Sequence, residues 1–181
     1  DSVGVDLEKE KAEFEARVEA DENDWVAWNA LGTVYFRLGD LEKAETALLR
    51  AQKLKPEEPG VLASLGMLRH RQKRNTEARG LLEKAIALNP GHGPAHNNLG
   101  LVLVALKEND AARSAFEAAL AANPNDLVAL ENLGLFLHYH LGDAKGAKRY
   151  LEHRMRVLQR GQYEITADDY REVAMAALFS D

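Results

Sequence analysis

The histidines are the residues of this sequence whose spacing first suggests chemistry, because imidazole nitrogens bind metals and transfer protons. His138 and His140 lie two residues apart. On a helix such side chains point about 200° apart, so they do not close on one ion. His92 and His96 have a four-residue spacing that serves metals, but neither a cysteine nor an acidic residue accompanies them. We expect packing roles for these histidines and no metal.

Other reactive patterns are missing from the sequence as well. It contains no phosphate-cradling glycine loop, no His-Glu-x-x-His helix and no nucleophile elbow. With no cysteine among 181 residues, it has no thiolate nucleophile, no disulfide and no cysteine metal site. We therefore expect no catalytic residue, no cofactor and no enzyme activity.

Composition narrows the class of partner. The formal net charge of −6 argues against nucleic acid, whose ligands usually present a dominant basic face. No apolar run approaches the roughly 20 residues that cross a bilayer, so we expect a soluble chain without membrane insertion. Cytoplasm and periplasm both stay open, because residue 1 is Asp and a leader could have been removed.

The elements that carry these residues follow from an internal repeat. Leu-Gly recurs every 34 residues, at Leu31-Gly32, Leu65-Gly66, Leu99-Gly100 and Leu133-Gly134. Alanines recur in step at Ala44, Ala78, Ala112, Ala51, Ala85 and Ala119, and prolines at Pro56, Pro90 and Pro124. Glycine in a helix costs about 1 kcal/mol relative to alanine. Four glycines in register therefore predict a second helix too close for a Cβ atom, and we expect the alanines to form the small surface opposite them.

This pattern resembles the tetratricopeptide repeat family, in which helix A carries a large residue, Leu-Gly and an aromatic, and helix B carries Ala, a large apolar residue, Ala and Pro. Residues 25–58 match nearly every position, with Trp28, Leu31, Gly32, Tyr35, Ala44, Leu48, Ala51 and Pro56. The resemblance implies an all-α fold, a right-handed superhelical solenoid of antiparallel helix pairs.

The repeat divides the chain into consecutive segments. Repeats occupy residues 25–58, 59–92, 93–126 and 127–160. The fourth has one extra residue in its turn, an extended helix B, and Arg154 where the second alanine would stand. Residues 1–24 form an acidic segment with the B helix of a half repeat, and Phe14 falls on the position of Leu48.

A linker and an amphipathic capping helix are expected in residues 161–181. The apolar face of this helix is formed by Tyr170, Val173, Ala174, Ala177 and Leu178. It either covers the end of the array or occupies its groove. Whether the chain is a fragment of a longer array stays open.

The family resemblance also implies a groove lined by the A helices, which takes a peptide or helix of a partner protein. Its lining here comprises Asn29, Thr33, Phe36, Arg37, Ala63, Met67, His70, Arg71, Asn97, Asn98, Leu101, Val104, Glu131, Asn132, Leu135, His138 and Tyr139. We expect the principal site in repeats 3 and 4, where Leu101, Val104 and Leu135 form an apolar patch. Asn98 and Asn132 either bind a peptide backbone there or bond within the array.

Two further functions stay open beside a binding scaffold. Residues 1–24 hold ten acidic and three basic side chains, whereas residues 145–160 hold six basic and one acidic. Both segments are solvated helix faces, or they associate head to tail in a homo-oligomer. The alternatives are therefore a self-assembling structural module and a regulatory segment of a larger enzyme. A receptor for chaperone tails is not expected, because Asn29, Thr33, Pro94 and Asn98 differ from the carboxylate-binding residues of such relatives.

Overall fold

The computed structural model describes the backbone of residues 2–178 and the side chains of residues 6–178. Residue 1 and residues 179–181 of the predicted terminal segments lie outside this range. Within it every regular element is an α-helix, which confirms the predicted all-α class. The helices are α1 (Ser2–Ala20), α2 (Trp25–Leu38), α3 (Leu41–Leu54), α4 (Pro59–Arg71), α5 (Asn75–Leu88), α6 (Gly93–Ala105), α7 (Asn109–Ala122), α8 (Leu127–Leu141), α9 (Ala144–Arg160) and α10 (Ala167–Leu178).

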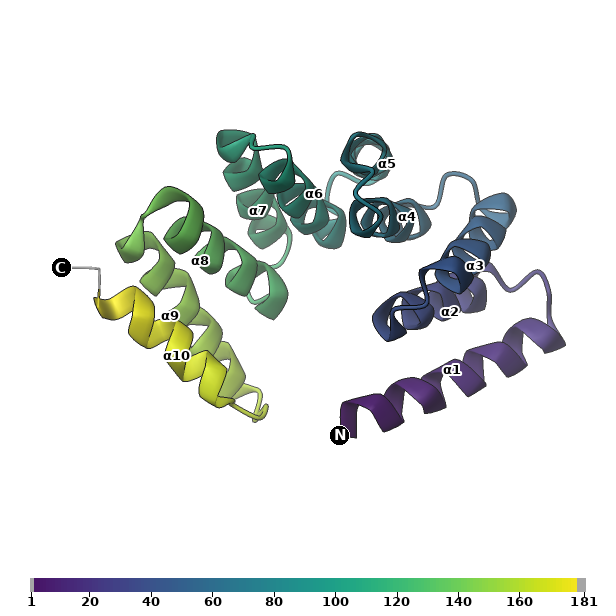
Figure 1. Cartoon of the computed structure of the whole chain (residues 1–181), viewed down its shortest axis with the longest axis horizontal. Coiled ribbons are helices and arrows are strands. Elements are labelled where there is room, and N and C mark those ends of the chain that lie inside the picture. Colours follow the sequence, from purple (N-terminus) through teal and green to yellow (C-terminus); the bar gives the residue numbers. More distant parts are fainter. Residues whose placement is uncertain (1, 179–181) are drawn as a thin grey trace. The chain divides into compact units, whose positions relative to one another are not determined.

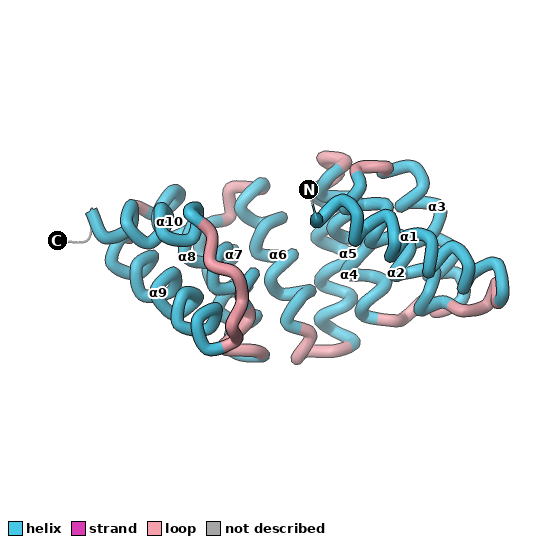
Figure 2. The backbone as a smooth tube through the Cα atoms, turned by 90° about the horizontal axis from the view of Figure 1, so that it is seen from below, coloured by secondary structure: helices cyan, strands magenta, loops and turns pink. Residues whose placement is uncertain are grey.

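The helices fall into two compact units, Asp1–Pro90 and Gly91–Asp181. In unit 1 the pairs α2/α3 and α4/α5 are antiparallel hairpins, α3 packs on α4, and α1 packs on α2 (Figure 1). In unit 2 the hairpins are α6/α7 and α8/α9, α7 packs on α8, and α10 lies along α9. Figure 2 shows that loops and turns are the only connections between the described helices.

The four glycines of the repeat mark the closest approach within each hairpin. A Cβ atom on Gly32, Gly66, Gly100 or Gly134 would lie 2.5–2.7 Å from a side-chain carbon of the paired helix, too close for any real contact. The side chain in question is Leu48, Leu82, Phe116 or Leu151, respectively. The predicted alanine surface lies next to this side chain, because the backbone oxygen of Ala44 is 3.3 Å from the Cβ position of Gly32. The large residue of helix B fills the space above each glycine, while alanines such as Ala44 and Ala51 are buried beside it.

Each turn between the helices of a hairpin contains one residue in the left-handed backbone region. These residues are Gly39 with φ 85°, Lys73 with φ 63°, Lys107 with φ 64° and Gly142 with φ 66°. The geometry thus recurs in all four hairpins, but only two of them use glycine. A Cβ atom makes this region unfavourable by roughly 1–2 kcal/mol.

Lys107→Gly is therefore expected to raise the free energy of unfolding by about 0.5–1 kcal/mol, after the greater chain entropy of glycine is subtracted. The reverse change, Gly39→Lys, is the matched control and is expected to lower it by a similar amount. Urea unfolding followed by circular dichroism measures both. Equal stability of Lys107→Gly and the parent would contradict this account of the turn.

Helix α10 packs with a face that the sequence did not predict. Asp169 and Ala176 are its buried residues, at 6% and 0% exposure. Of the predicted apolar face, Val173 packs against the core of unit 2, but Tyr170 is 59% and Leu178 76% exposed. Ala174 is exposed as well, so the predicted face was wrong for Tyr170, Ala174 and Leu178. Helix α10 packs on α9 with Asp169 and Ala176 buried instead.

Candidate functional site

The predicted groove residues of unit 2 lie on two neighbouring A helices, α6 and α8, which contact each other. Leu101 and Val104 on α6 are half-buried and pack against the edge of the hydrophobic core. Leu135 on α8 is half-buried as well, and Tyr139 is 61% exposed. Apolar side chains are thus accessible on both helices where charged groups would normally meet solvent.

A pocket of about 460 Å³ adjoins this apolar surface. Its residues come from α8, α9, α10 and the segment before α10: Glu131, Leu135, Tyr139, Arg154, Thr166, Asp168, Asp169, Arg171, Glu172 and Met175. Three of them were predicted as groove residues, namely Glu131, Leu135 and Tyr139. Helix α10 forms one wall of the pocket. It therefore borders the groove of repeat 4 and does not fill it. We call this surface, from Leu101 and Val104 to the pocket, the unit 2 groove.

Sequence reasoning missed the contribution of α10. Met175 and Glu172 face the pocket because α10 follows α9 in the way that a helix A follows a helix B. The signal was present in the sequence, since Tyr170, Val173 and Ala174 repeat the spacing of Trp28, Leu31 and Gly32.

Arg154 organises the polar side of the pocket. Its guanidinium lies 2.8 Å from a carboxylate oxygen of Glu131 on α8 and pairs with Asp169 on α10. Asp169 also accepts hydrogen bonds from the backbone N–H and the hydroxyl of Thr166, at 2.6 and 2.8 Å. Arg154 therefore joins three helices from the position at which the other repeats carry alanine.

Glu172 and Asp168 are the two remaining carboxyl groups of the pocket. Burial and the nearby carboxylate of Glu131 raise the pKa of Glu172 above its usual value. Asp168 forms an exposed ion pair with Arg171. Since Arg154 is shared by two carboxylates, the local potential is negative and favours a cationic group on a ligand.

The asparagines of the predicted groove differ in their surroundings. Asn97 is 7% exposed, and its side-chain oxygen accepts a hydrogen bond of 3.0 Å from the side-chain amide of Asn132. One donor of Asn132 is therefore used within unit 2, as the packing interpretation of these asparagines expects. Asn98 is half-buried on α6. Asn97 is thus a core residue of the unit.

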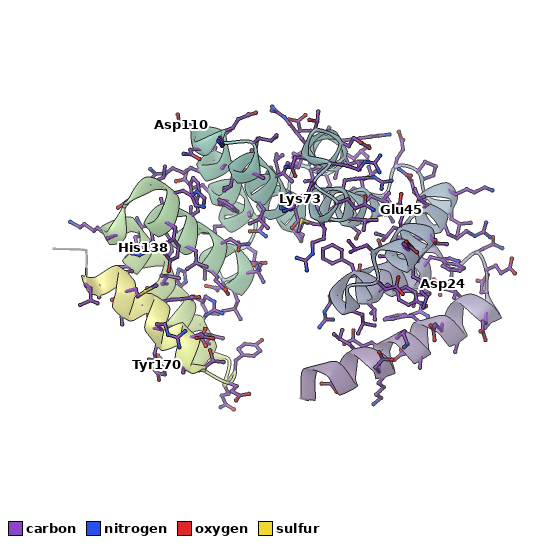
Figure 3. The ribbon with its side chains drawn as sticks, in the orientation of Figure 1. Asp24, Glu45, Lys73, Asp110, His138 and Tyr170 are labelled. Carbon is purple, nitrogen blue, oxygen red and sulfur yellow. The ribbon has the colours of Figure 1, made fainter. Side chains whose placement is uncertain are left out.

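The histidines have structural surroundings. His92 accepts a hydrogen bond of 3.0 Å from the backbone N–H of Ala95 and so caps α6. The ring of His138, labelled in Figure 3, meets Tyr139 edge to face with 4.7 Å between centroids. Among residues 6–178 no three His, Cys, Asp or Glu side chains are arranged to hold a metal ion.

The predicted groove residues of unit 1 form a more polar surface. Arg71 lies 5.7 Å from the centre of the Phe36 ring, and Arg37 pairs with Glu10 of α1 at 3.2 Å. Thr33 donates to the backbone oxygen of Asn29 within α2. The other members differ in exposure: Met67 and His70 are half-buried and Ala63 is 4% exposed.

Comparison of the chain with models of known protein families identifies its repeat. Tetratricopeptide repeat models match residues 11–59, 29–93 and 70–133. The chain belongs to the tetratricopeptide repeat family. It is an all-α helical repeat solenoid, and membership of this family supports a role as a protein-interaction scaffold.

Solved structures agree with this fold at low sequence identity. TTC0263, a thermophilic tetratricopeptide repeat protein of Thermus thermophilus, is 22% identical, with a TM-score of 0.78 over 93% of this chain and 89% of that one. PilW, a type IV pilus biogenesis factor, is 22% identical, with a TM-score of 0.78 over 99% of this chain and 83% of that one. YrrB, described as having an unusual peptide-binding site, is 21% identical, with a TM-score of 0.60 over 98% and 86%. No curated protein matches the chain in sequence.

One further property of the tetratricopeptide helices concerns membranes. Among the described residues, no helix is long and apolar enough to span a bilayer.

Proposed function

We propose that the chain is a non-catalytic scaffold whose unit 2 groove binds a peptide or helix of a partner protein. The observation that carries this proposal is the apolar surface shared by α6 and α8. Leu101, Val104 and Leu135 are accessible there beside the exposed ring of Tyr139. Contiguous exposed apolar surface on a soluble protein usually marks an interaction site.

The pocket at the end of this surface provides depth. Leu135, Tyr139 and Met175 supply its apolar contacts, and Glu131, Asp169 and Glu172 line its acidic side. We therefore expect one anchor of the ligand to occupy the pocket, apolar where it meets Leu135 and Met175 and cationic at its end toward Glu131 and Glu172. A second, apolar anchor would lie against Leu101 and Val104. Backbone contacts would come from the amide of Asn98, since a donor of Asn132 is already engaged.

YrrB, a protein of similar fold, is described as having an unusual peptide-binding site, which supports a peptide ligand here. The present chain is 21% identical to YrrB, so the two proteins share the fold but few side chains. Unit 2 supports the proposal better than unit 1. In unit 1 the corresponding face carries Arg37 and Arg71, which pair with Glu10 and Phe36.

Leu101→Asp combined with Leu135→Asp is expected to abolish binding to unit 2, because two carboxylates would have to be desolvated against apolar anchors. The probe is a set of peptides selected on the parent protein from a phage-displayed random library, then synthesised with a fluorophore. Fluorescence anisotropy should show binding weakened by about 100-fold or more.

The matched control is Leu49→Asp combined with Leu88→Asp, which makes the same two changes at exposed leucines of α3 and α5. It should bind the peptides like the parent, and circular dichroism should show the same helical content for all three proteins. Normal binding by the Leu101→Asp, Leu135→Asp protein would place the site elsewhere and overturn the proposal.

A further inference from the structure

Helix α10 has the register of a helix A. It begins at Ala167 as α2 begins at Trp25, and its residues then correspond one by one. Tyr170, Val173, Ala174 and Ala177 stand where α2 has Trp28, Leu31, Gly32 and Tyr35. Burial agrees with this register, because the two buried residues of α10, Asp169 and Ala176, correspond to Ala27 and Val34, which are 0% and 2% exposed.

No described helix stands where a helix B would cover α10. In α2 the small residue of the pattern, Gly32, lies under Leu48 of α3, at a distance that leaves no space for a Cβ atom. The corresponding Ala174 of α10 is exposed, and so is Tyr170, which is labelled in Figure 3. Within the described part of the chain no helix covers this face of α10.

Helix α1 has the converse register, that of a helix B, and no described helix stands in the place of its helix A. Phe14 stands at the position of Leu48, which is 1% exposed in its hairpin, whereas Phe14 remains half-exposed. Glu10 and Arg17 occupy the two flanking alanine positions. Glu10 pairs with Arg37 at 3.2 Å and Arg17 with Asp24 at 2.7 Å. The guanidinium carbon of Arg17 also lies 5.5 Å from the centre of the Phe14 ring, so Arg17 must turn aside when Phe14 enters the contact.

We propose that α1 of a second copy of this chain packs on α10 as its missing helix B, so that two molecules complete one repeat head to tail. The large Phe14 side chain would lie over Ala174, as Leu48 lies over Gly32. Ala174 has one Cβ atom more than glycine. Val173 and Ala177 are smaller than Leu31 and Tyr35, which leaves room for the larger residues of α1.

Charge complementarity supports this pairing. Consecutive B helices flank the same A helix, as the pocket between α1 and α3 shows: Glu15 and Glu19 line it from one side, Lys43 and Ala47 from the other. In the composite repeat α9 and α1 of the second copy would take these two places. In α9 of the first copy, Glu152 and Arg156 hold the positions of Glu15 and Glu19. In α1 of the second copy, Lys9 and Glu13 hold the positions of Lys43 and Ala47.

The two facing pairs carry opposite charges. Glu152 would face Lys9 of the second copy, and Arg156 would face Glu13 of the second copy. None of these four side chains has an ion pair within the described residues, and Lys9, Glu13 and Arg156 are exposed. The acidic N-terminal helix and the basic α9 thus gain partners through the contact.

The contact joins two different surfaces, so each of the two molecules still presents one of these surfaces after the contact forms. Such heterologous association produces open chains of increasing length instead of a closed dimer. Sedimentation velocity of the protein should therefore show a weight-average mass that rises steadily with concentration from the 20.1 kDa of one chain. A monomer at every concentration, or a plateau at the dimer, would overturn the proposal.

Ala174→Glu is expected to weaken association at least tenfold, because its carboxylate would be buried under Phe14 of the next molecule. Since Ala174 is exposed on its helix, this change should leave the fold intact. The control Ala121→Glu adds the same charge at an exposed alanine of α7 and should associate like the parent. Equal association of both variants would contradict a contact through α10.

A charge exchange tests the second half of the contact. Arg156→Glu alone and Glu13→Arg alone should each weaken association by about five- to tenfold, since each places like charges opposite each other. Combined in one chain they restore opposite charges and should bring association back to within about twofold of the parent. A double variant as weak as the single ones would overturn the placement of α1 beside α9.

Discussion

Gly66→Leu is expected to lower the free energy of unfolding by at least about 1–3 kcal/mol, the usual cost of overpacking a filled interior. A Cβ atom on Gly66 would lie 2.7 Å from Cγ of Leu82, and both Leu82 methyl carbons are within 3.3 Å. Leu82 is itself fully buried, so moving it displaces other core side chains. The helices of the α4/α5 hairpin would therefore have to separate.

Gly80→Leu is the control for this prediction. Gly80 lies in α5 of the same hairpin, and nothing stands within 4 Å of the Cβ atom that it would gain. Since leucine favours the helix over glycine, this variant should be equal to the parent or more stable by up to about 1 kcal/mol. Urea unfolding measures both variants, and a Gly66→Leu curve that coincides with the parent would refute the packing role of the repeated glycines.

Arg154→Ala is the second large effect, although it restores the alanine of the other repeats. It removes the cation that Asp169 and Glu131 share, and Asp169 is only 6% exposed. Breaking a buried pair by removing one partner costs about 3–5 kcal/mol, and the partial exposure of Arg154 reduces this to about 2 kcal/mol or more. We expect α10 to loosen, which limited proteolysis would detect as earlier cleavage between α9 and α10.

Arg171→Ala is the matched control, because Arg171 forms an exposed ion pair with Asp168. An exposed pair of this kind contributes at most about 1 kcal/mol. If both variants lose the same stability and α10 is cleaved at the parent rate in each, Arg154 does not anchor α10.

Acidification should also lower the free energy of unfolding, as Arg154→Ala does. Burial opposes ionisation of Asp169, but hydrogen bonds from Arg154 and Thr166 outweigh it and lower the pKa of the carboxyl below its usual value. The resulting stabilisation is complete above the unfolded pKa of about 3.9 and is lost as pH falls through the lower folded pKa. The stability difference between the parent and Arg154→Ala should therefore shrink below about pH 4. If the stability difference between the two proteins stays constant down to pH 2, the ionised Asp169 carboxylate does not contribute to stability through Arg154.

The repeat itself could be predicted because its causes are local and periodic. The spacing of Gly32, Gly66, Gly100 and Gly134 located the hairpins, since each glycine marks a helix that must accept a close neighbour. The same spacing placed Leu101 and Leu135 on a common face of successive A helices. Their binding role stays a proposal, and the structure adds to it the pocket that Leu135 lines.

Other features depended on which side chains meet in space. The sequence showed that Arg154 departs from the repeat, but only the fold brings Glu131 and Asp169, from two other helices, to its guanidinium. It showed neighbouring asparagines, but only the contact of α6 with α8 joins Asn97 to Asn132.

The sequence by itself therefore determined the helices, their pairing and their register, because helical period, glycine and proline act over a few residues of the chain. The tertiary structure alone decided which face of α10 is buried. An apolar stripe indicates that a helix can pack, but the position of the neighbouring helix in the fold decides which face is buried. Here that neighbour is α9, which covers Asp169 and Ala176 and leaves Tyr170 in solvent.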